Sequence, residues 1–272
     1  MKPKSSETSA SWLKLNQPGL WRKFSLVLWR SPVEAVRFTG VIELVVAGIE
    51  GVLRERKDRG NTRQLTWTPV LLHAWCKALQ QNPELNVFVR KNVFYTRRNV
   101  DALLRMNVQE PAGTASLWAC YLRGTQEKSL LEIALHLERH QKKIENSDAR
   151  YPRMSRVLEA LPVLLLRGIW DFQNWSQNRL GWRPGFMPDL SYPSISMSNL
   201  GSLGGVLLAP LVVRGLHCPI HLSLGNAKKG RLPLILGLDH RVLDAGAAVR
   251  LLQKVQEILN SEQFLGEIRH IP

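Results

Sequence analysis

Acidic residues and cysteines are scarce in this sequence of 272 residues. Asp and Glu number 22 against 37 Lys and Arg, so the formal net charge at pH 7 is +15. The three cysteines, Cys76, Cys120 and Cys218, are scattered and form no C-x-x-C pair. This pattern excludes a disulfide framework and a cysteine-based structural zinc site. It is typical of a cytoplasmic protein, and we expect that location and no metal cofactor.

Long hydrophobic runs are also absent. The best candidate, Leu161–Leu166, is far shorter than the ~20 residues that a transmembrane helix needs. The N-terminus lacks the apolar core, roughly 7–15 residues long, of a secretory signal. Residues 1–20 are polar and rich in Ser and Lys, which predicts a mobile tail. A single domain is expected over residues 21–272.

The remaining composition indicates a folded protein that attracts an anion. Hydrophobic residues make up 44% and charged residues 22% of the chain, which excludes a fully disordered or fibrous protein. The positive charge predicts nucleic acid, an acidic lipid surface or a phosphate-rich small molecule such as coenzyme A as the partner. Nucleic acid is disfavoured because no binding motif is present and the basic residues are spread along the chain. The membrane surface and the small molecule both remain open.

Hydrophobic periodicity predicts helices and strands that are interspersed along the chain. Strands are expected at residues 36–44, 86–95, 99–108, 118–123, 194–198, 206–213, 220–224 and 232–238, with the second and third paired. Helices are expected at residues 44–56, 70–79, 127–144 and 247–259. In the second helix, Thr68 is the expected N-cap and Pro69 the first helical residue. Residues 148–190 have no regular pattern. No repeat or linker divides the chain, which favours one α/β domain.

The segment Leu238–Gly246, L-D-H-R-V-L-D-A-G, carries a candidate general base. His240 falls at the end of an expected strand, and Asp244 falls at the start of an expected helix. Imidazole is a competent proton acceptor at neutral pH, and a nearby carboxylate can hold it or its loop in one orientation. The pattern taken alone is equally consistent with a charged turn that caps a helix.

A second segment, Ile195–Gly205, reads I-S-M-S-N-L-G-S-L-G-G. Its glycines allow the backbone to pass close to another part of the protein. A Ser hydroxyl at a strand end, here that of Ser198, can donate a hydrogen bond to a developing oxyanion. Taken alone, the segment is also consistent with an ordinary turn of small residues.

Together, S-N-L-G-S-L-G-G and the later D-H-R-V-L-D resemble the catalytic domain of the dihydrolipoyl acyltransferases of 2-oxo-acid dehydrogenase complexes. Upstream, Thr68–Asn86 and Gln126–Leu137 are similar to the two long helices of that family. The similarity runs from about Trp21 to Leu265. It implies an α/β (α+β) fold, the chloramphenicol acetyltransferase-like two-layer sandwich of a mixed sheet with helices.

The resemblance also implies roles for three residues. His240 would be the general base that deprotonates a thiol, hydroxyl or amine acceptor, which is a small molecule or is attached to a carrier. Ser198 would hydrogen-bond the oxyanion formed on the thioester carbonyl, and Asp244 would fix the active-site loop. The acyl donor would be a coenzyme A thioester or another acyl-thioester. The family works as a homotrimer, so His240 would face Ser198 of a neighbouring subunit.

The sequence departs from the family pattern at several places. Ala245 stands where the family usually has Gly, which would strain the loop if that position requires a positive φ. Gln109–Leu122 lacks the Arg-Gly-Leu-hydrophobic-Pro pattern, and 148–190 is longer and richer in Trp and Arg. No lipoyl attachment site or subunit-binding domain precedes the core, so a free-standing member is expected. An alternative is a trimeric scaffold without turnover that associates with a membrane.

Three further segments leave their functions open. His217, Cys218 and His221 suggest a metal only weakly, because no carboxylate is near them in sequence. The turn Gly225–Gly230, G-N-A-K-K-G, is a solvated hairpin turn or a phosphate contact for coenzyme A. The segment 153–183 packs as a peripheral helix, lies on a membrane surface or walls a substrate pocket.

Overall fold

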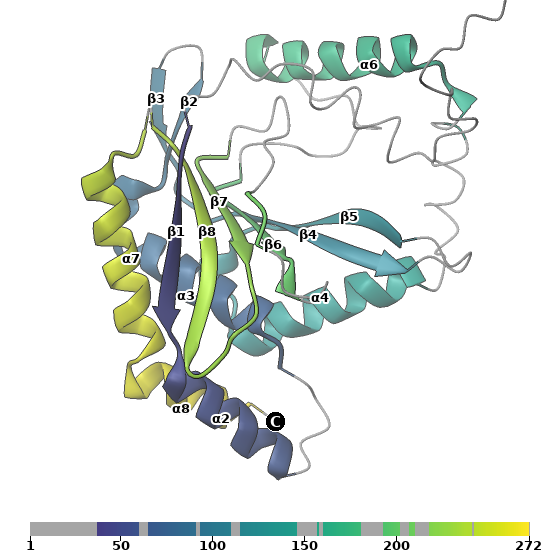
Figure 1. Ribbon diagram of the computed structural model, residues 1–272. Helices are drawn as coiled ribbons and strands as arrows, with labels where there is room; N and C mark the ends of the chain where they lie inside the picture. The colour runs from purple at the N-terminus through teal and green to yellow at the C-terminus, as the bar shows by residue number, and fades with distance from the viewer. Residues whose placement is uncertain are drawn as a thin grey trace, which may run out of the picture.

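A six-stranded mixed sheet is the centre of the computed structural model (Figure 1). The structure describes residues 37–59, 65–90, 93–109, 115–145, 157, 160–180, 193–201, 207–209, 218–240 and 242–271. The strand order is β1-β8-β7-β6-β4-β5. The strands are β1 (Arg37–Val45), β4 (Ala102–Gln109), β5 (Ala115–Leu122), β6 (Ile195–Asn199), β7 (Ile220–Leu224) and β8 (Arg231–Asp239). Strand β6 is parallel to both of its neighbours, whereas the other pairs are antiparallel.

Helices cover one face of this sheet and enclose the core. They are α2 (Ala47–Asp58), α3 (Trp67–Gln81), α4 (Leu130–Glu145), α7 (Ala245–Leu259) and α8 (Glu262–Arg269). Helix α3 is buried along most of its length, and Trp75 is fully buried within the core. The predicted fold class, a mixed sheet layered with helices, is therefore confirmed.

The two faces of the sheet differ in chemistry because successive side chains of a strand point to opposite sides. On β6, Ile195 and Met197 belong to the helix-covered core, and Ser196 and Ser198 alternate with them. On β7, Ile220 and the leucines enter the same core, while His221 and Ser223 take the alternate positions. The face away from the helices is thus polar in its centre.

Helix α8 is absent from the sequence prediction, yet it closes the core. His73 of α3 is buried, and its Nε2 lies 2.8 Å from Glu267 Oε1 of α8. The Nζ of Lys77 donates to Glu267 Oε2 at 2.7 Å. The buried Arg56 of α2 donates to the carbonyls of Ile268 and Ile271. These contacts tie the last described residues to two helices from early in the chain.

Several predicted elements are wrong in detail. Residues 86–95 are not one strand: β2 (Val87–Arg90) and β3 (Val93–Thr96) pair with each other in a separate two-stranded sheet. The expected pairing of 86–95 with 99–108 is therefore wrong, and β4 pairs with β5 and β6 instead.

The start of α3 and two later segments also differ from expectation. Helix α3 begins at Trp67 with Thr66 as N-cap, so Thr68 and Pro69 lie inside its first turn. The missing N–H of Pro69 costs no hydrogen bond there. The stretch 148–190 contains α6 (Val163–Trp175), followed by a π-helical turn, Ser176–Leu180. In the predicted strand 206–213, residues 207–209 are not in a strand, and the other residues lie outside the described part of the chain. The predicted tail at 1–20 also lies outside it.

Candidate functional site

His240 lies immediately after the buried strand β8, at the surface. The N–H groups of Val242 and Leu243 both donate to the carbonyl of Asp239, at 3.1 and 3.0 Å, and fold the chain into a turn. The imidazole ring and the ring of Phe38 on β1 form a T-shaped contact, with a centroid distance of 4.9 Å and an interplanar angle of 60°. A rigid strand therefore ends in an accessible imidazole.

Asp244 is the N-cap of α7, the helix that follows this turn. Its Oδ1 accepts a hydrogen bond from the N–H of Ala247 at 2.6 Å. A carboxylate is well suited to this position because the first N–H groups of a helix lack partners and carry positive partial charge. The predicted role in fixing the loop thus has a local structural basis, the anchoring of the helix that ends the loop.

Ala245 is the first residue of α7 and has no positive φ. The condition under which alanine would strain the loop, a positive φ at this position, is therefore not met. A residue that enters a right-handed helix gains nothing from the freedom of glycine.

Replacement of Asp244 by alanine is expected to lower the free energy of unfolding by about 1 kcal/mol, because it removes the α7 cap. Asp244→Asn keeps an acceptor oxygen and should retain most of the stability. Urea denaturation followed by circular dichroism measures both variants. An Asp244→Ala variant as stable as the parent protein would contradict the capping role.

Ser198 lies near the end of the central strand β6, on the polar face of the sheet. Its Cα pairs with Arg105 of β4 on one side and Ser223 of β7 on the other. The next residue, Asn199, points to the helices, and its Nδ2 donates to Thr68 Oγ1 of α3 at 3.0 Å. The end of β6 is therefore held from the helix side while Ser198 faces away from it.

Gly201 confirms the expected close approach after this strand. A Cβ at this position would lie 2.5 Å from Asn226 Oδ1 and 2.7 Å from the carbonyl oxygen of Gly225. Any larger residue would push the β7–β8 turn away from the end of β6. Gly204 and Gly205 lie outside the described residues.

Buried polar groups surround Ser198 on this face. Ser196, Ser223 and His221 are each at most 2% exposed. Burial lowers the pKa of His221 well below its usual value, and the nearby Arg37 and Arg105 lower it further. Its Nε2 lies 3.0 Å from the carbonyl oxygen of Cys218, and this contact opposes the lowering of the pKa with a smaller effect.

Cys218 shows no sign of being a nucleophile or a metal ligand. Burial raises the pKa of its thiol to about 11, so the reactive thiolate is scarce at neutral pH. Its Sγ donates to the carbonyl of Ile220 at 3.1 Å. Among the described residues no group of His, Cys, Asp and Glu side chains is arranged to hold a metal ion, and His217 lies outside them.

The turn G-N-A-K-K-G joins β7 to β8, as predicted. Lys229 and Gly230 both have positive φ, at 51° and 74°. A Cβ on Gly230 would lie 2.8 Å from Cβ of Ala47. The N–H of Gly230 donates to Glu50 Oε2 at 2.7 Å. The two lysines are exposed, and a phosphate contact by them stays a prediction.

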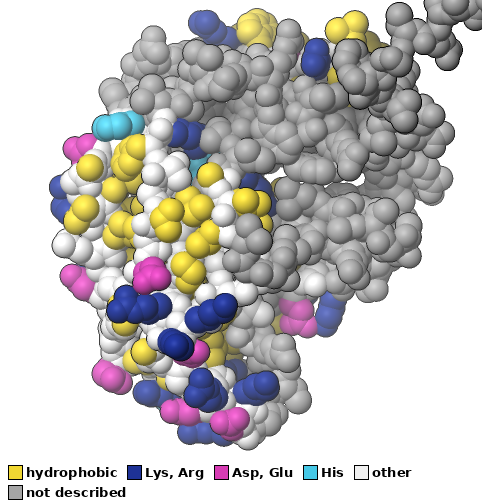
Figure 2. Space-filling model, viewed as in Figure 1, with side chains coloured by type: hydrophobic (Ala, Val, Ile, Leu, Met, Phe, Trp, Pro, Cys, Tyr) yellow, Lys and Arg dark blue, Asp and Glu magenta, His cyan; other side chains and the backbone are white. Residues whose placement is uncertain are grey.

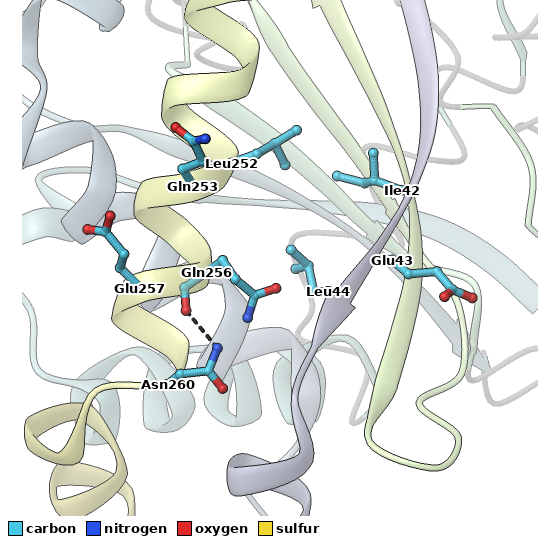
Figure 3. A pocket seen from close by; sticks show the side chains of 8 residues that line it. All are labelled: Ile42, Glu43, Leu44, Leu252, Gln253, Gln256, Glu257 and Asn260. Atoms are coloured by element: carbon cyan, nitrogen blue, oxygen red, sulfur yellow. Dashed lines mark hydrogen bonds between the residues drawn. The ribbon is translucent and has the colours of Figure 1, made fainter.

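One groove was not foreseen from the sequence (Figure 3). It lies between β1 and α7 and is lined by Ile42, Glu43, Leu44, Leu252, Gln253, Gln256, Glu257 and Asn260. The Gln256 amide accepts from the N–H of Val45 and donates to its carbonyl, at 2.8 and 2.7 Å. The two hydrogen bonds of Gln256 fasten α7 to β1 at this groove, and two carboxylates, Glu43 and Glu257, also line it.

His240 and Ser198 do not meet within one chain. Ser198 pairs with Ser223, which pairs with Ile235, and His240 follows Ile235 five residues later. At ~3.3 Å per residue the two residues are offset by about 16 Å along the strands and by two strand spacings across them. A single site that uses both residues therefore requires two copies of the chain.

The fold is shared with a solved acyltransferase. The dihydrolipoamide acetyltransferase of Azotobacter vinelandii, whose structure was studied for the role of a serine, a histidine and an asparagine in catalysis, superposes with a TM-score of 0.64. The match covers 97% of this chain and 99% of that chain at 18% sequence identity. At this identity the likeness establishes the fold.

The family is shown by sequence. Residues 20–156 match the 2-oxoacid dehydrogenases acyltransferase (catalytic domain) family, and the chain belongs to that family. The predicted resemblance is thereby confirmed, although the matched residues end before Ser198 and His240.

Two curated relatives are the dihydrolipoyllysine-residue acetyltransferase component of pyruvate dehydrogenase complex. The Buchnera aphidicola protein is 36% identical over 84 residues, which cover 27% of this chain and 20% of that protein. The Mycoplasma capricolum protein is 20% identical over 260 residues, 94% of this chain and 52% of that protein. The chain thus spans at most about half the length of these relatives.

Proposed function

We propose that this chain is an acyltransferase that moves an acyl group from coenzyme A or another acyl-thioester to a thiol, hydroxyl or amine acceptor. The observation that carries the proposal is the accessible imidazole of His240, held between the buried strand β8 and the capped helix α7. Family membership supports the reaction class. The net charge of +15 favours a phosphate-bearing donor.

In the proposed reaction an imidazole nitrogen of His240 accepts the proton of the acceptor as its heteroatom attacks the thioester carbonyl. A tetrahedral intermediate forms, and the Ser198 hydroxyl donates a hydrogen bond to its oxyanion. The intermediate collapses with cleavage of the C–S bond. The imidazolium returns the proton to the departing thiolate, so that the free thiol and the acylated acceptor leave.

The active form is proposed to be a homotrimer with the sites between subunits. The family resemblance implies this assembly, and the separation of His240 from Ser198 along the sheet supports it. In a cyclic oligomer the same pair of surfaces repeats at each interface. Each interface would then combine His240 of one subunit with Ser198 of the next.

The experiment that tests the proposal is thiol release from a series of acyl-CoAs with pooled thiol, amine and alcohol acceptors. Ser198→Ala is expected to lower kcat by roughly 10²–10³-fold with a smaller effect on KM, as for the loss of one oxyanion donor. Ser223→Ala is the matched control, because Ser223 lies beside Ser198 on the same face of the sheet.

Two results would count against the proposal. An equal loss of kcat in the Ser198→Ala and Ser223→Ala variants would mean that Ser198 has no special role in catalysis. No release from any pair, together with no heat of acyl-CoA binding in calorimetry, would favour the alternative of a trimeric scaffold without turnover.

A further inference from the structure

Helix α6 (Val163–Trp175) exposes large apolar side chains along one side. Leu164 is 77% exposed, Leu165 54%, Phe172 46% and Trp175 52%, and Ile169 is also exposed. At 100° per residue these five positions fall within one arc of less than half the helix circumference. An exposed apolar cluster of this kind is typical of an interaction site on a protein surface.

The opposite side of α6 is already buried. Leu166, Trp170 and Gln173 are each at most 8% exposed. The helix therefore buries one face, formed by Leu166, Trp170 and Gln173, while it presents an apolar face outward. Packing of α6 against the part of the chain that the structure describes does not explain the outer face.

The sequence that contains α6 is rich in arginine. The sequence from 150 to 183 contains Arg150, Arg153, Arg156, Arg167, Arg179 and Arg183, against Glu159 and Asp171. In Figure 2, hydrophobic side chains lie between Lys and Arg side chains along the edge of the molecule where Figure 1 places α6. Arg179, in the turn after the helix, is exposed.

We propose that the outer face of α6 lies on an anionic lipid bilayer. Leu, Ile, Phe and Trp side chains on one face of a helix, accompanied by arginines, are suited to the boundary between acyl chains and headgroups. The outer face is a ridge of one helix rather than a groove, which suits a deformable surface. The charge of +15 complements anionic headgroups. No described helix has the length and apolar character needed to cross a membrane, so α6 is proposed to rest on the bilayer.

The test is co-sedimentation of the full chain with vesicles of phosphatidylcholine alone or with one fifth phosphatidylglycerol. Leu165→Glu is compared with Val249→Glu on α7, because Val249 is 52% exposed and the change in charge and polarity is nearly the same. We expect strong binding to the anionic vesicles only. Leu165→Glu should weaken it about tenfold or more, and Val249→Glu by less than about threefold. Leu164→Gln, which adds no charge, should also weaken binding to the anionic vesicles.

Three outcomes would overturn the proposal. In the first, the parent chain fails to bind anionic vesicles. In the second, the Leu165→Glu and Val249→Glu variants bind equally well, which would mean that net charge alone determines the binding. In the third outcome, Leu165→Glu and Leu164→Gln lower the oligomeric state without lipid, and the face is then a contact between copies of the chain. The thermal unfolding midpoint of each variant, measured without lipid, checks that it is folded. Acyl transfer in lipid-free buffer should be unchanged in all of them, so this proposal and the proposed reaction fail separately.

Discussion

Replacement of His240 by alanine is expected to lower kcat for acyl transfer by roughly 10²–10⁴-fold, the usual contribution of a general base. The effect should be chemical rather than structural, because His240 is exposed and lies after the end of β8 rather than within the core. Thiol release measured at saturating donor and acceptor reports the loss. Gel filtration should show the same oligomer as for the parent chain.

His270→Ala is the matched control for this variant. His270 is likewise exposed and follows a helix, α8, at the far end of the described chain. Its replacement should change kcat by less than about twofold, as for other surface changes. A His240→Ala protein that retains the parent rate would refute the proposed mechanism.

Two inactive variants are expected to restore activity when they are assembled in one oligomer. His240→Ala supplies an intact Ser198, and Ser198→Ala supplies an intact His240. In any mixed trimer, one of the three interfaces joins the two intact residues, so about one third of the parent activity should return. Co-expression with two different affinity tags, followed by purification on both, isolates the mixed oligomers for the thiol-release assay.

The recovered fraction also reports the assembly. A mixed dimer with the same arrangement would regain about half of the parent activity, because one of its two interfaces is intact. If each site lay within one subunit, the mixed oligomer would remain inactive. The strand register argues against a site within one subunit, since β6, β7 and β8 place His240 and Ser198 far apart in one chain.

Much of the fold could be predicted from local patterns. Strands β7 and β8 and helix α7 were expected within one or two residues of their observed bounds, because buried strands and amphipathic helices carry strong periodic signals. Helix α8 was missed because it is short and begins only three residues after the end of α7 in the sequence. The β2–β3 hairpin was missed because a run of strand-forming residues does not itself show where it turns.

The arrangement of the site depended on pairings that no local pattern contains. The sequence placed His240 at a strand end and Asp244 at a helix start, and both placements are confirmed. It contained no signal for the neighbours of Ser198, because the parallel pairing of β6 with β4 brings together residues that are distant in the chain. The catalytic roles of His240, Ser198 and Asp244 stay predictions.

The alternation of side chains along β6 and β7 also separates two kinds of evolutionary constraint. Ile195, Met197 and Leu222 are held by the need to fill a close-packed core, where a change of one methylene group is felt. Their immediate neighbours Ser196 and His221 face the other way. A change at Ser196 or His221 therefore alters the hydrogen bonds and the chemistry beside Ser198, whereas a change at Ile195, Met197 or Leu222 alters the packing of the core. Divergence in specificity and conservation of architecture can proceed on adjacent residues of the same strand.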